Sequence, residues 1–296
     1  MPPGREILTP MPDLGAVLTA IITPFDERNR VNEDAFVTLM RHLGENGSDG
    51  FVVAGTTGEA STLTEEEQLG LIGLAVAERP AGKTIIAGTG TNDTRQAVHL
   101  TERATELGVD AVLSVTPYYN RPSPLGLRRH YEAVAAATDK PTLLYNIPSR
   151  TGTNIPPELL AELARIDGVA GVKQANPDEL QPIEGLDLYA GDDASFLRTL
   201  QIGGAGVISV ASHIVGTEMR RMVDEPERRR EIDAQLQEVY AAMGVTTNPI
   251  PVKAALNLLG HDVGGLRLPL VEADERETAV VRTALERLGL LATASA

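Results

Sequence analysis

The chain has 296 residues, of which 42% are hydrophobic, and this length suits one large α/β domain or two small ones. Its 26 basic and 41 acidic residues give a net charge of −15, which argues against a nucleic-acid or anionic-membrane partner. The chain has no cysteine, which excludes disulfides, thiolate metal ligands and a cysteine nucleophile.

The histidine spacing, the length of the apolar runs and the N-terminal composition bear on metal binding and location. The histidines are scattered without the spacing of a metal site, so we expect no bound metal. No apolar run is long enough to cross a membrane, and a reducing cytoplasm is the expected location. Residues 1–14 begin with a proline-rich stretch that has no apolar core. We therefore expect a disordered or loosely held tail there and no signal peptide.

Short apolar runs alternate with amphipathic stretches from residue 16 onward. The apolar runs predict strands at residues 16–22, 50–54, 84–87, 111–115, 141–145, 169–173, 187–190 and 206–210. The stretches between them predict helices at residues 32–43, 65–79, 94–107, 125–137, 156–165 and 195–200. The strands are continuously apolar, which is typical of parallel strands that are buried on both faces.

This alternation predicts the fold class α/β, and within it a (β/α)8 TIM barrel over residues 15–223. After the eighth strand the pattern is helical only, at about residues 226–243, 251–259 and 273–290. We interpret residues 224–296 as a C-terminal helical appendage that is long enough to fold against the barrel.

The active site of such a barrel lies at the carboxyl ends of the strands, where Lys173 ends the sixth predicted strand. A lysine held in a dry site can lose its proton, because burial disfavours the charged form. The neutral amine is a nucleophile that forms a Schiff base with a carbonyl compound. The alternative is that Lys173 is a solvated residue where a strand gives way to a loop.

A glycine-rich loop, GTTGE at residues 55–59, follows the second predicted strand. Its backbone N–H groups and the hydroxyls of Thr56 and Thr57 could hold a carboxylate. The same residues also suit a tight turn without a ligand. The loop lacks the Gly-Lys-Ser/Thr ending of a phosphate-binding loop.

Tyrosines and an arginine follow the fourth and fifth predicted strands: Tyr118, Tyr119, Tyr145 and Arg150. Tyrosine hydroxyls can pass protons, since each oxygen both donates and accepts a hydrogen bond. Arg150 would hold a substrate carboxylate through two parallel hydrogen bonds. The alternatives are packing for the tyrosines and a surface ion pair for the arginine.

Seven segments together resemble the dihydrodipicolinate synthase and N-acetylneuraminate lyase family of pyruvate-dependent class I aldolases. They are GTTGE at 55–59, TPYYNRP at 116–122, YNIPSRTG at 145–152, GVK at 171–173, GDD at 191–193, GVIS at 206–209 and NPIPVK at 248–253. Each segment is a weak signal alone, whereas their order and spacing together are highly specific. The resemblance extends from about residue 15 to about residue 290.

The resemblance implies that Lys173 forms a Schiff base with pyruvate and that Tyr145 shuttles protons as the imine becomes an enamine. It implies that Thr56 and Tyr119 complete a proton relay with Tyr145, and that the tyrosine reaches in from a neighbouring subunit. No metal or organic cofactor is implied, because the lysine itself supplies the electron sink. The implied assembly is a homotetramer built from tight dimers.

The resemblance also implies a second substrate, L-aspartate-4-semialdehyde, and 4-hydroxy-tetrahydrodipicolinate as the product, in lysine and diaminopimelate biosynthesis. Thr57 would hold the pyruvate carboxylate, Arg150 would hold the carboxylate of the aldehyde, and Ile208 would make a backbone contact beside the imine. The chain between Lys173 and Gly191 is shorter than in many members, so we expect the sixth helix to be clipped or absent.

Two alternative functions stay open at this point. One is an aldolase of the same family that acts on a sugar-derived 2-keto acid, of the 2-keto-3-deoxygluconate or N-acetylneuraminate type. Arg150 argues against it, since a guanidinium suits a short carboxylated aldehyde better than a polyol. The other is a catalytically silent barrel that serves as a binding or assembly protein. It would have lost Lys173, Tyr145 or the relay of Thr56 and Tyr119, and all of these residues are present. Fold alone does not fix function.

The family's lysine-feedback pocket is only partly matched. Asn92 and Tyr118 fit its pattern, but Gln96 stands at the glutamate position, and Glu65 and Gln68 stand at histidine positions. Loss of the acidic group weakens a site for a cationic amino acid. We expect weak or no inhibition by lysine.

Overall fold

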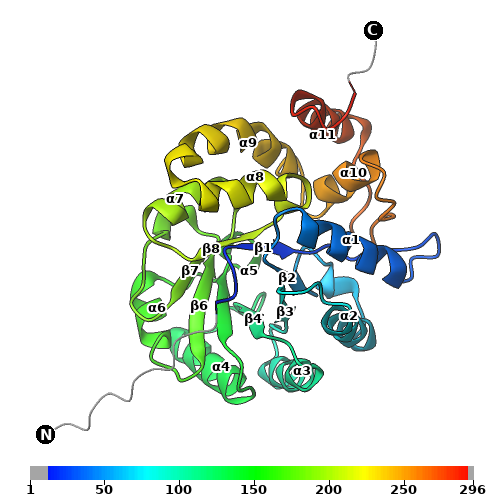
Figure 1. Ribbon diagram of the computed structural model, residues 1–296. Coiled ribbons are helices and arrows are strands. Elements are labelled where there is room, and N and C mark those ends of the chain that lie inside the picture. Colours follow the sequence, from blue (N-terminus) through cyan, green and yellow to red (C-terminus); the bar gives the residue numbers. More distant parts are fainter. Residues whose placement is uncertain (1–12, 293–296) are drawn as a thin grey trace, which may run out of the picture.

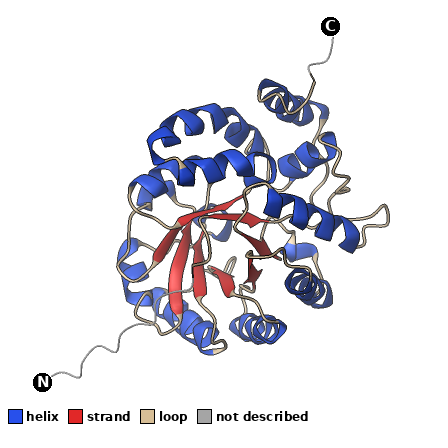
Figure 2. Ribbon diagram, in the orientation of Figure 1, coloured by secondary structure: helices blue, strands red, loops and turns tan. Residues whose placement is uncertain are grey.

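Each of the short apolar runs forms a strand, and the strands close into a parallel barrel. The computed structural model describes residues 13–292. Its strands pair in chain order, and β1 is hydrogen-bonded to both β2 and β8. Figure 2 shows the strands inside a ring of helices. The strands are β1 (Val17–Ala20), β2 (Gly50–Val53), β3 (Thr84–Gly88), β4 (Ala111–Val115), β5 (Thr142–Asn146), β6 (Val169–Gln174), β7 (Asp187–Ala190) and β8 (Gly206–Ser209). The predicted (β/α)8 barrel is confirmed.

Helices surround the barrel (Figure 1). The first four of them begin where a side chain accepts a hydrogen bond from one of the first backbone N–H groups. Thr64, for example, accepts a hydrogen bond from the backbone of Glu67, whose side chain accepts one from the backbone of Thr64 in return. The barrel helices are α1 (Glu33–Glu45), α2 (Glu65–Ala77), α3 (Thr94–Leu107), α4 (Pro124–Ala136), α5 (Pro148–Thr151), α6 (Pro157–Leu163), α7 (Phe196–Gln201) and α8 (Ser212–Asp224).

The connection after β6 lacks the α-helix of a regular alternation, whereas β8 is followed by one. Between β6 and β7, where every residue is described, the chain makes a single 3-10 turn at Pro177–Glu179 in place of an α-helix. This confirms the expected clipping of the sixth helix. After β8 the chain forms α8, which the sequence pattern did not predict. Its buried side chains include Met219 and Met222, and Val215 interrupts its helical backbone.

The C-terminal helices are α9 (Arg229–Met243), α10 (Ile250–Leu258) and α11 (Glu275–Arg287). The predicted helical appendage is confirmed, although its first helix begins with a 3-10 turn at Pro226–Arg228. These helices pack against α8 and against one another, and they share one apolar core with the barrel helices. The predicted boundary between residues 223 and 224 falls at the end of α8 and stays a prediction.

The described chain enters the barrel at Leu14, which is buried and whose carbonyl accepts a hydrogen bond from the Thr84 hydroxyl at 2.8 Å. Residues 1–12 of the predicted tail lie outside the described residues. Among the helices of residues 13–292, none combines the length and apolar character that crossing a membrane requires.

Candidate active site

Lys173 and Tyr145 lie side by side on neighbouring strands at the carboxyl end of the barrel. The pairing of β5 and β6 places them directly opposite each other. The Lys173 side chain is 5% exposed, and its Nζ lies 4.3 Å from the centroid of the Tyr145 ring. Burial lowers the pKa of Lys173 to about 8, against an opposing effect of the Asp193 charge. The site therefore holds an amine that is partly neutral near physiological pH.

Asp193 is a buried carboxylate that follows β7 and belongs to the GDD segment, and no role was predicted for it. Its Oδ1 accepts a hydrogen bond from the Ser209 hydroxyl at 2.6 Å, and its Oδ2 accepts one from the backbone N–H of Ala211 at 2.9 Å. Burial raises the pKa of the Asp193 carboxyl, while these hydrogen bonds oppose that rise. A negative charge at Asp193 favours a cation at Lys173.

The Tyr145 hydroxyl belongs to a buried side chain. Burial raises the pKa of Tyr145 to about 12, and the nearby charge of Arg150 partly offsets this rise. The phenol is therefore protonated at neutral pH, so it can receive a proton only as it passes its own proton on. Thr56 is exposed on the loop after β2. Tyr119 is 91% exposed, so within one chain it does not join the buried pair.

In the loop after β2, Thr56 is exposed and Thr57 is buried. Thr57 is buried, and its Oγ1 accepts a hydrogen bond from Nδ2 of Asn248 at 2.9 Å. The Thr23 hydroxyl donates to the carbonyl of Gly58 at 2.7 Å. Glu59 ends the loop with a left-handed backbone, at a φ of 55°. The loop is thus fixed at three consecutive residues before the chain reaches α2.

Glu59 forms a buried ion pair with Lys253 of α10. Its Oε1 lies 2.6 Å from Nζ of Lys253, and both side chains are 1% exposed. Nζ also donates a hydrogen bond to the carbonyl of Gly265 and lies 4.2 Å from the centroid of the Phe25 ring. Burial lowers the pKa of Lys253, and the charge of Glu59 opposes that change. The loop that bears Thr57 is therefore anchored to the C-terminal helices.

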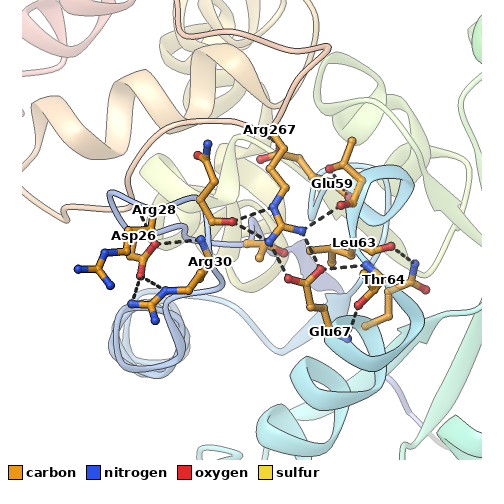
Figure 3. Close-up of polar contacts among 12 residues, drawn as sticks. Asp26, Arg28, Arg30, Glu59, Leu63, Thr64, Glu67 and Arg267 are labelled. Atoms are coloured by element: carbon orange, nitrogen blue, oxygen red, sulfur yellow. Dashed lines mark hydrogen bonds and ion pairs between the residues drawn. The ribbon is translucent and has the colours of Figure 1, made fainter.

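A second attachment comes from Arg267, which lies in the segment between α10 and α11. Its backbone N–H donates to Oε2 of Glu59 at 3.1 Å. Its guanidinium makes two hydrogen bonds to the Glu67 carboxylate, at 2.6 and 2.7 Å, and one to the carbonyl of Thr62 at 2.9 Å. Figure 3 shows this arginine reaching the start of α2 and the loop before it. The C-terminal segment thus contacts the connection between β2 and α2 as well as the first turn of α2.

Arg150 lies on α5, with its side chain exposed. Its Nη2 donates a hydrogen bond to the carbonyl of Asn248 at 3.2 Å. Ile208 lies in β8 and is buried. The predicted binding residues Thr57 and Arg150 therefore share a neighbour, Asn248, whereas Ile208 lies in β8, between β7 and β1.

Two buried amides, Asn146 and Gln174, and the half-buried Asn154 connect the strand ends beside Tyr145 and Lys173. The side chain of Asn146 in β5 donates to Oε1 of Gln174 in β6 at 3.0 Å and to Oδ1 of Asn154 at 2.9 Å. Asn154 in turn donates to both carboxylate oxygens of Glu179, in the 3-10 turn that replaces the sixth helix. Sequence analysis missed these amides, although polar residues at the end of apolar strands are a usable signal.

Neither of two surface cavities is lined by Lys173 or Tyr145, although Lys253 borders the first. One, of about 300 Å³, borders α10 and is lined by residues that include Ile250, Asn257 and Leu266. The other, of about 600 Å³, opens at the amino ends of the strands, beside Ala16 and Asp187. That end of a barrel contributes to stability more than to catalysis. Within the described residues, no group of three or more His, Asp or Glu side chains is placed to hold a metal ion.

Comparisons with known proteins agree with this geometry. Residues 13–288 match the Dihydrodipicolinate synthetase family. A 4-hydroxy-tetrahydrodipicolinate synthase from Heliobacterium modesticaldum is 42% identical over 290 residues, which cover 94% of this chain and 97% of that protein. A structure of DHDPS from Cyanidioschyzon merolae with lysine bound superposes with a TM-score of 0.91 at 40% identity, covering 94% and 99% of the two chains. The chloride-inhibited dihydrodipicolinate synthase from Acinetobacter baumannii, complexed with pyruvate, gives a TM-score of 0.90 at 34% identity, covering 94% and 100%.

Proposed function

The chain belongs to the dihydrodipicolinate synthetase family, and we propose that it condenses pyruvate with L-aspartate-4-semialdehyde to give 4-hydroxy-tetrahydrodipicolinate. The activity is that of a class I aldolase-type lyase in lysine and diaminopimelate biosynthesis, since relatives that carry the synthase name match the chain over nearly its full length. The same relatives favour this reaction over the cleavage of a sugar-derived 2-keto acid. The main structural support for the mechanism is that Lys173 and Tyr145 are buried side by side.

The first step is the formation of an imine. The neutral Nζ of Lys173 attacks the carbonyl carbon of pyruvate, and a water molecule leaves. A pKa near 8 supports this role, because an ordinary lysine is almost fully protonated at neutral pH. The imine is cationic when protonated, and the buried carboxyl of Asp193 lies close enough to influence the charge at Lys173.

The carboxylate of pyruvate is held by the loop after β2. The Thr57 hydroxyl and the backbone N–H groups of residues 55–58 supply donors of the kind that bind a carboxylate. Ile208, in β8 beside β1, supplies a backbone contact next to the imine. These contacts fix pyruvate with its methyl group available for deprotonation.

The second step makes the carbon–carbon bond. Tyr145 takes up the proton lost from the pyruvate methyl group as its own hydroxyl proton passes to Thr56 and Tyr119. The resulting enamine attacks the aldehyde carbon, and the aldehyde oxygen takes up a proton from the same relay. Thr56 and Tyr119 pass protons between Tyr145 and the solvent. Arg150 holds the carboxylate of the aldehyde, and its exposed side chain beside Asn248 supports this role. The amino group of the condensed product then displaces Lys173 as the ring closes.

The exposure of Tyr119 supports an assembly in which this side chain acts in a neighbouring subunit. A large aromatic side chain that is 91% exposed, next to a half-exposed Tyr118, is typical of a surface that another protein covers. We propose a homotetramer built from tight dimers, with Tyr119 of one subunit completing the relay of its partner.

The test is pyruvate consumption by the purified protein with L-aspartate-4-semialdehyde, run beside Lys173→Ala. Consumption by the wild-type protein and its loss in the variant would support the reaction and the role of the lysine together. Borohydride trapping of pyruvate, followed by peptide mass spectrometry, locates the modified lysine. Trapping on Lys173 without consumption of this aldehyde would exclude the proposed second substrate.

A further inference from the structure

We propose that Asn248 is a positioning residue that directs the hydroxyl hydrogen of Thr57 toward the carboxylate of pyruvate. The inference rests on the proposed function, because it concerns how the Thr57 hydroxyl binds pyruvate. Asn248 lies just before α10 and is separated from Thr57 by 191 residues of chain.

The geometry of the contact sets the direction of the hydrogen bond. Nδ2 of Asn248 is 2.9 Å from Oγ1 of Thr57 and donates to it. An amide nitrogen carries hydrogens only, so the threonine oxygen must accept here. The single hydroxyl hydrogen of Thr57 is then available to another acceptor. A carboxylate oxygen of pyruvate is such an acceptor, and a hydrogen bond to a charged group is stronger than one between neutral groups.

The same residue also contacts the group assigned to the second substrate. The backbone carbonyl of Asn248 accepts a hydrogen bond from Nη2 of Arg150 at 3.2 Å. Asn248 therefore touches the side chain assigned to the pyruvate carboxylate and the side chain assigned to the aldehyde carboxylate. A change to its side chain alters the first contact and leaves the backbone acceptor of the second in place.

The position of Asn248 is held by the buried ion pair next to it. Lys253 lies on the same short segment as Asn248, and Glu59 lies on the same loop as Thr57. Two links, Asn248 to Thr57 and Lys253 to Glu59, therefore join the same two segments. Such a double attachment keeps the amide and the hydroxyl in one relative orientation.

An acid at this position would reverse the hydrogen bond. Aspartate has the shape of asparagine but only accepts, so a carboxylate at position 248 would take the hydroxyl hydrogen of Thr57 for itself. It would also place a negative charge close to the carboxylate of pyruvate. In the wild-type protein, Oδ1 of Asn248 is buried and receives no hydrogen bond from the described residues, so an anion would be poorly stabilised there.

The experiment measures how much pyruvate half-saturates borohydride trapping on Lys173. This readout needs no aldehyde. We expect Asn248→Asp to raise the half-saturating pyruvate concentration about 10- to 100-fold, the size expected for loss of a hydrogen bond to a charged group. Asn248→Ala keeps the hydroxyl free but leaves it unoriented, so we expect a smaller rise, about 3- to 10-fold. The maximal trapping rate should stay close to that of the wild-type protein in both variants.

Gln235→Glu is the matched control. Gln235 is exposed on α9, so this change makes the same replacement of an amide by an acid without the contact to Thr57. It should leave the half-saturating concentration unchanged. A similar rise in Gln235→Glu would show that added charge alone explains the effect and would overturn the proposal.

A double-mutant cycle with Thr57→Val separates positioning from general damage. Without the hydroxyl, the change Asn248→Asp should raise the half-saturating concentration little further. An equal rise in the Thr57→Val background, or no rise in the wild-type background, overturns the proposal. Should Asn248→Asp fail to fold, the same cycle with Asn248→Ala decides between these outcomes. A protein that traps pyruvate but consumes none with L-aspartate-4-semialdehyde would contradict the proposed reaction alone.

Discussion

Nζ of Lys173 lies 4.3 Å from the centroid of the Tyr145 ring, and the paired ends of β5 and β6 place the two residues opposite each other. The face of an aromatic ring attracts a cation. Burial nevertheless has the larger effect and lowers the pKa of Lys173 to about 8. The pair therefore combines an amine that titrates near neutral pH with a phenol that does not.

The rate of imine formation should rise with pH and level off above about pH 8, because only the neutral amine attacks pyruvate. Below that pH the rate should fall about tenfold for each pH unit. The measurement is borohydride trapping with subsaturating pyruvate between pH 6 and pH 10. The variant Lys173→Ala should show no trapping at any pH. A midpoint near the ordinary lysine value of 10.5 would contradict the assignment.

The same burial should destabilise the fold below pH 8. An unfolded lysine binds its proton with a pKa of 10.5 and the folded one with a pKa of about 8, so the unfolded state is favoured by about 3 kcal/mol at neutral pH. This cost disappears as the pH rises from 8 to 10.5. We expect Lys173→Met to be inactive, and more stable than the wild type at pH 7.

Denaturant unfolding at pH 7 and at pH 10 checks this prediction, since the advantage of the methionine variant should shrink at the higher pH. Lys140→Met is the control, because Lys140 is partly exposed and, within residues 13–292, forms an ion pair only with its neighbour Asp139. A stability gain in Lys173→Met that is equal at both pH values would contradict the explanation.

The buried pair of Glu59 and Lys253 should be sensitive to the loss of either partner. Lys253→Met leaves a buried carboxylate without its cation, which we expect to cost about 3–5 kcal/mol of stability. The double variant Glu59→Gln, Lys253→Met should recover part of that loss. Arg41→Met is the control, since Arg41 and Glu78 form an exposed pair whose loss should cost less than about 1 kcal/mol. Equal losses in the two single variants would show that burial is not the cause.

Tyr119 should act across a subunit boundary. We expect Tyr119→Phe to lower kcat about 100-fold, the usual size for loss of a proton-transfer group. Mixing and reassembling Tyr119→Phe subunits with Lys173→Ala subunits should restore part of the activity, because a mixed interface pairs an intact lysine with an intact tyrosine. Activity is measured before and after reassembly, with sedimentation to establish that mixed oligomers have formed. Mixed oligomers without recovered activity would place Tyr119 in its own subunit's site or outside the relay.

Lysine should inhibit this protein weakly or not at all. Gln96 lacks the negative charge that would bind a cationic amino acid, and the Glu65 carboxylate is paired with His99 at 3.0 Å. The Gln68 side chain is also occupied, because it donates to the carbonyl of Ala60 at 2.9 Å. Initial rates with lysine at up to millimolar concentrations test this. A micromolar inhibition constant would contradict it, and Gln96→Glu should strengthen whatever inhibition remains.

The parts of the fold that follow from local pattern were predictable from the sequence. A strand buried on both faces must be a continuous apolar run, and this requirement located β1 to β8 within a few residues. Closure of the barrel then placed the ends of β5 and β6 together, as the resemblance required of Tyr145 and Lys173. The helix α8 was missed because polar residues such as Ser212 and His213 are buried on it, and because Val215 breaks its regular backbone.

The contacts that orient the site were not predictable in this way. Asn248 and Thr57 are 191 positions apart in the chain, and no sequence pattern links the two residues. Lys253, the last residue of the NPIPVK segment, could not be told from an exposed helix lysine by its sequence alone. In the structure it is buried against Glu59. Such pairings depend on how the C-terminal helices pack on the barrel, which is set by the whole core and by no single segment.

The attachment of the Thr57 loop to the C-terminal helices also bears on how the protein is made. A chain emerges from the ribosome with its N-terminus first, so the eight strands are synthesised before Asn248 and Lys253 exist. Until then the Glu59 carboxylate lacks its ion-pair partner Lys253, and the Thr57 hydroxyl lacks the hydrogen bond from the Asn248 amide. A nascent barrel thus contains Lys173 early, but the loop of Thr57 gains its last contacts only near the end of translation.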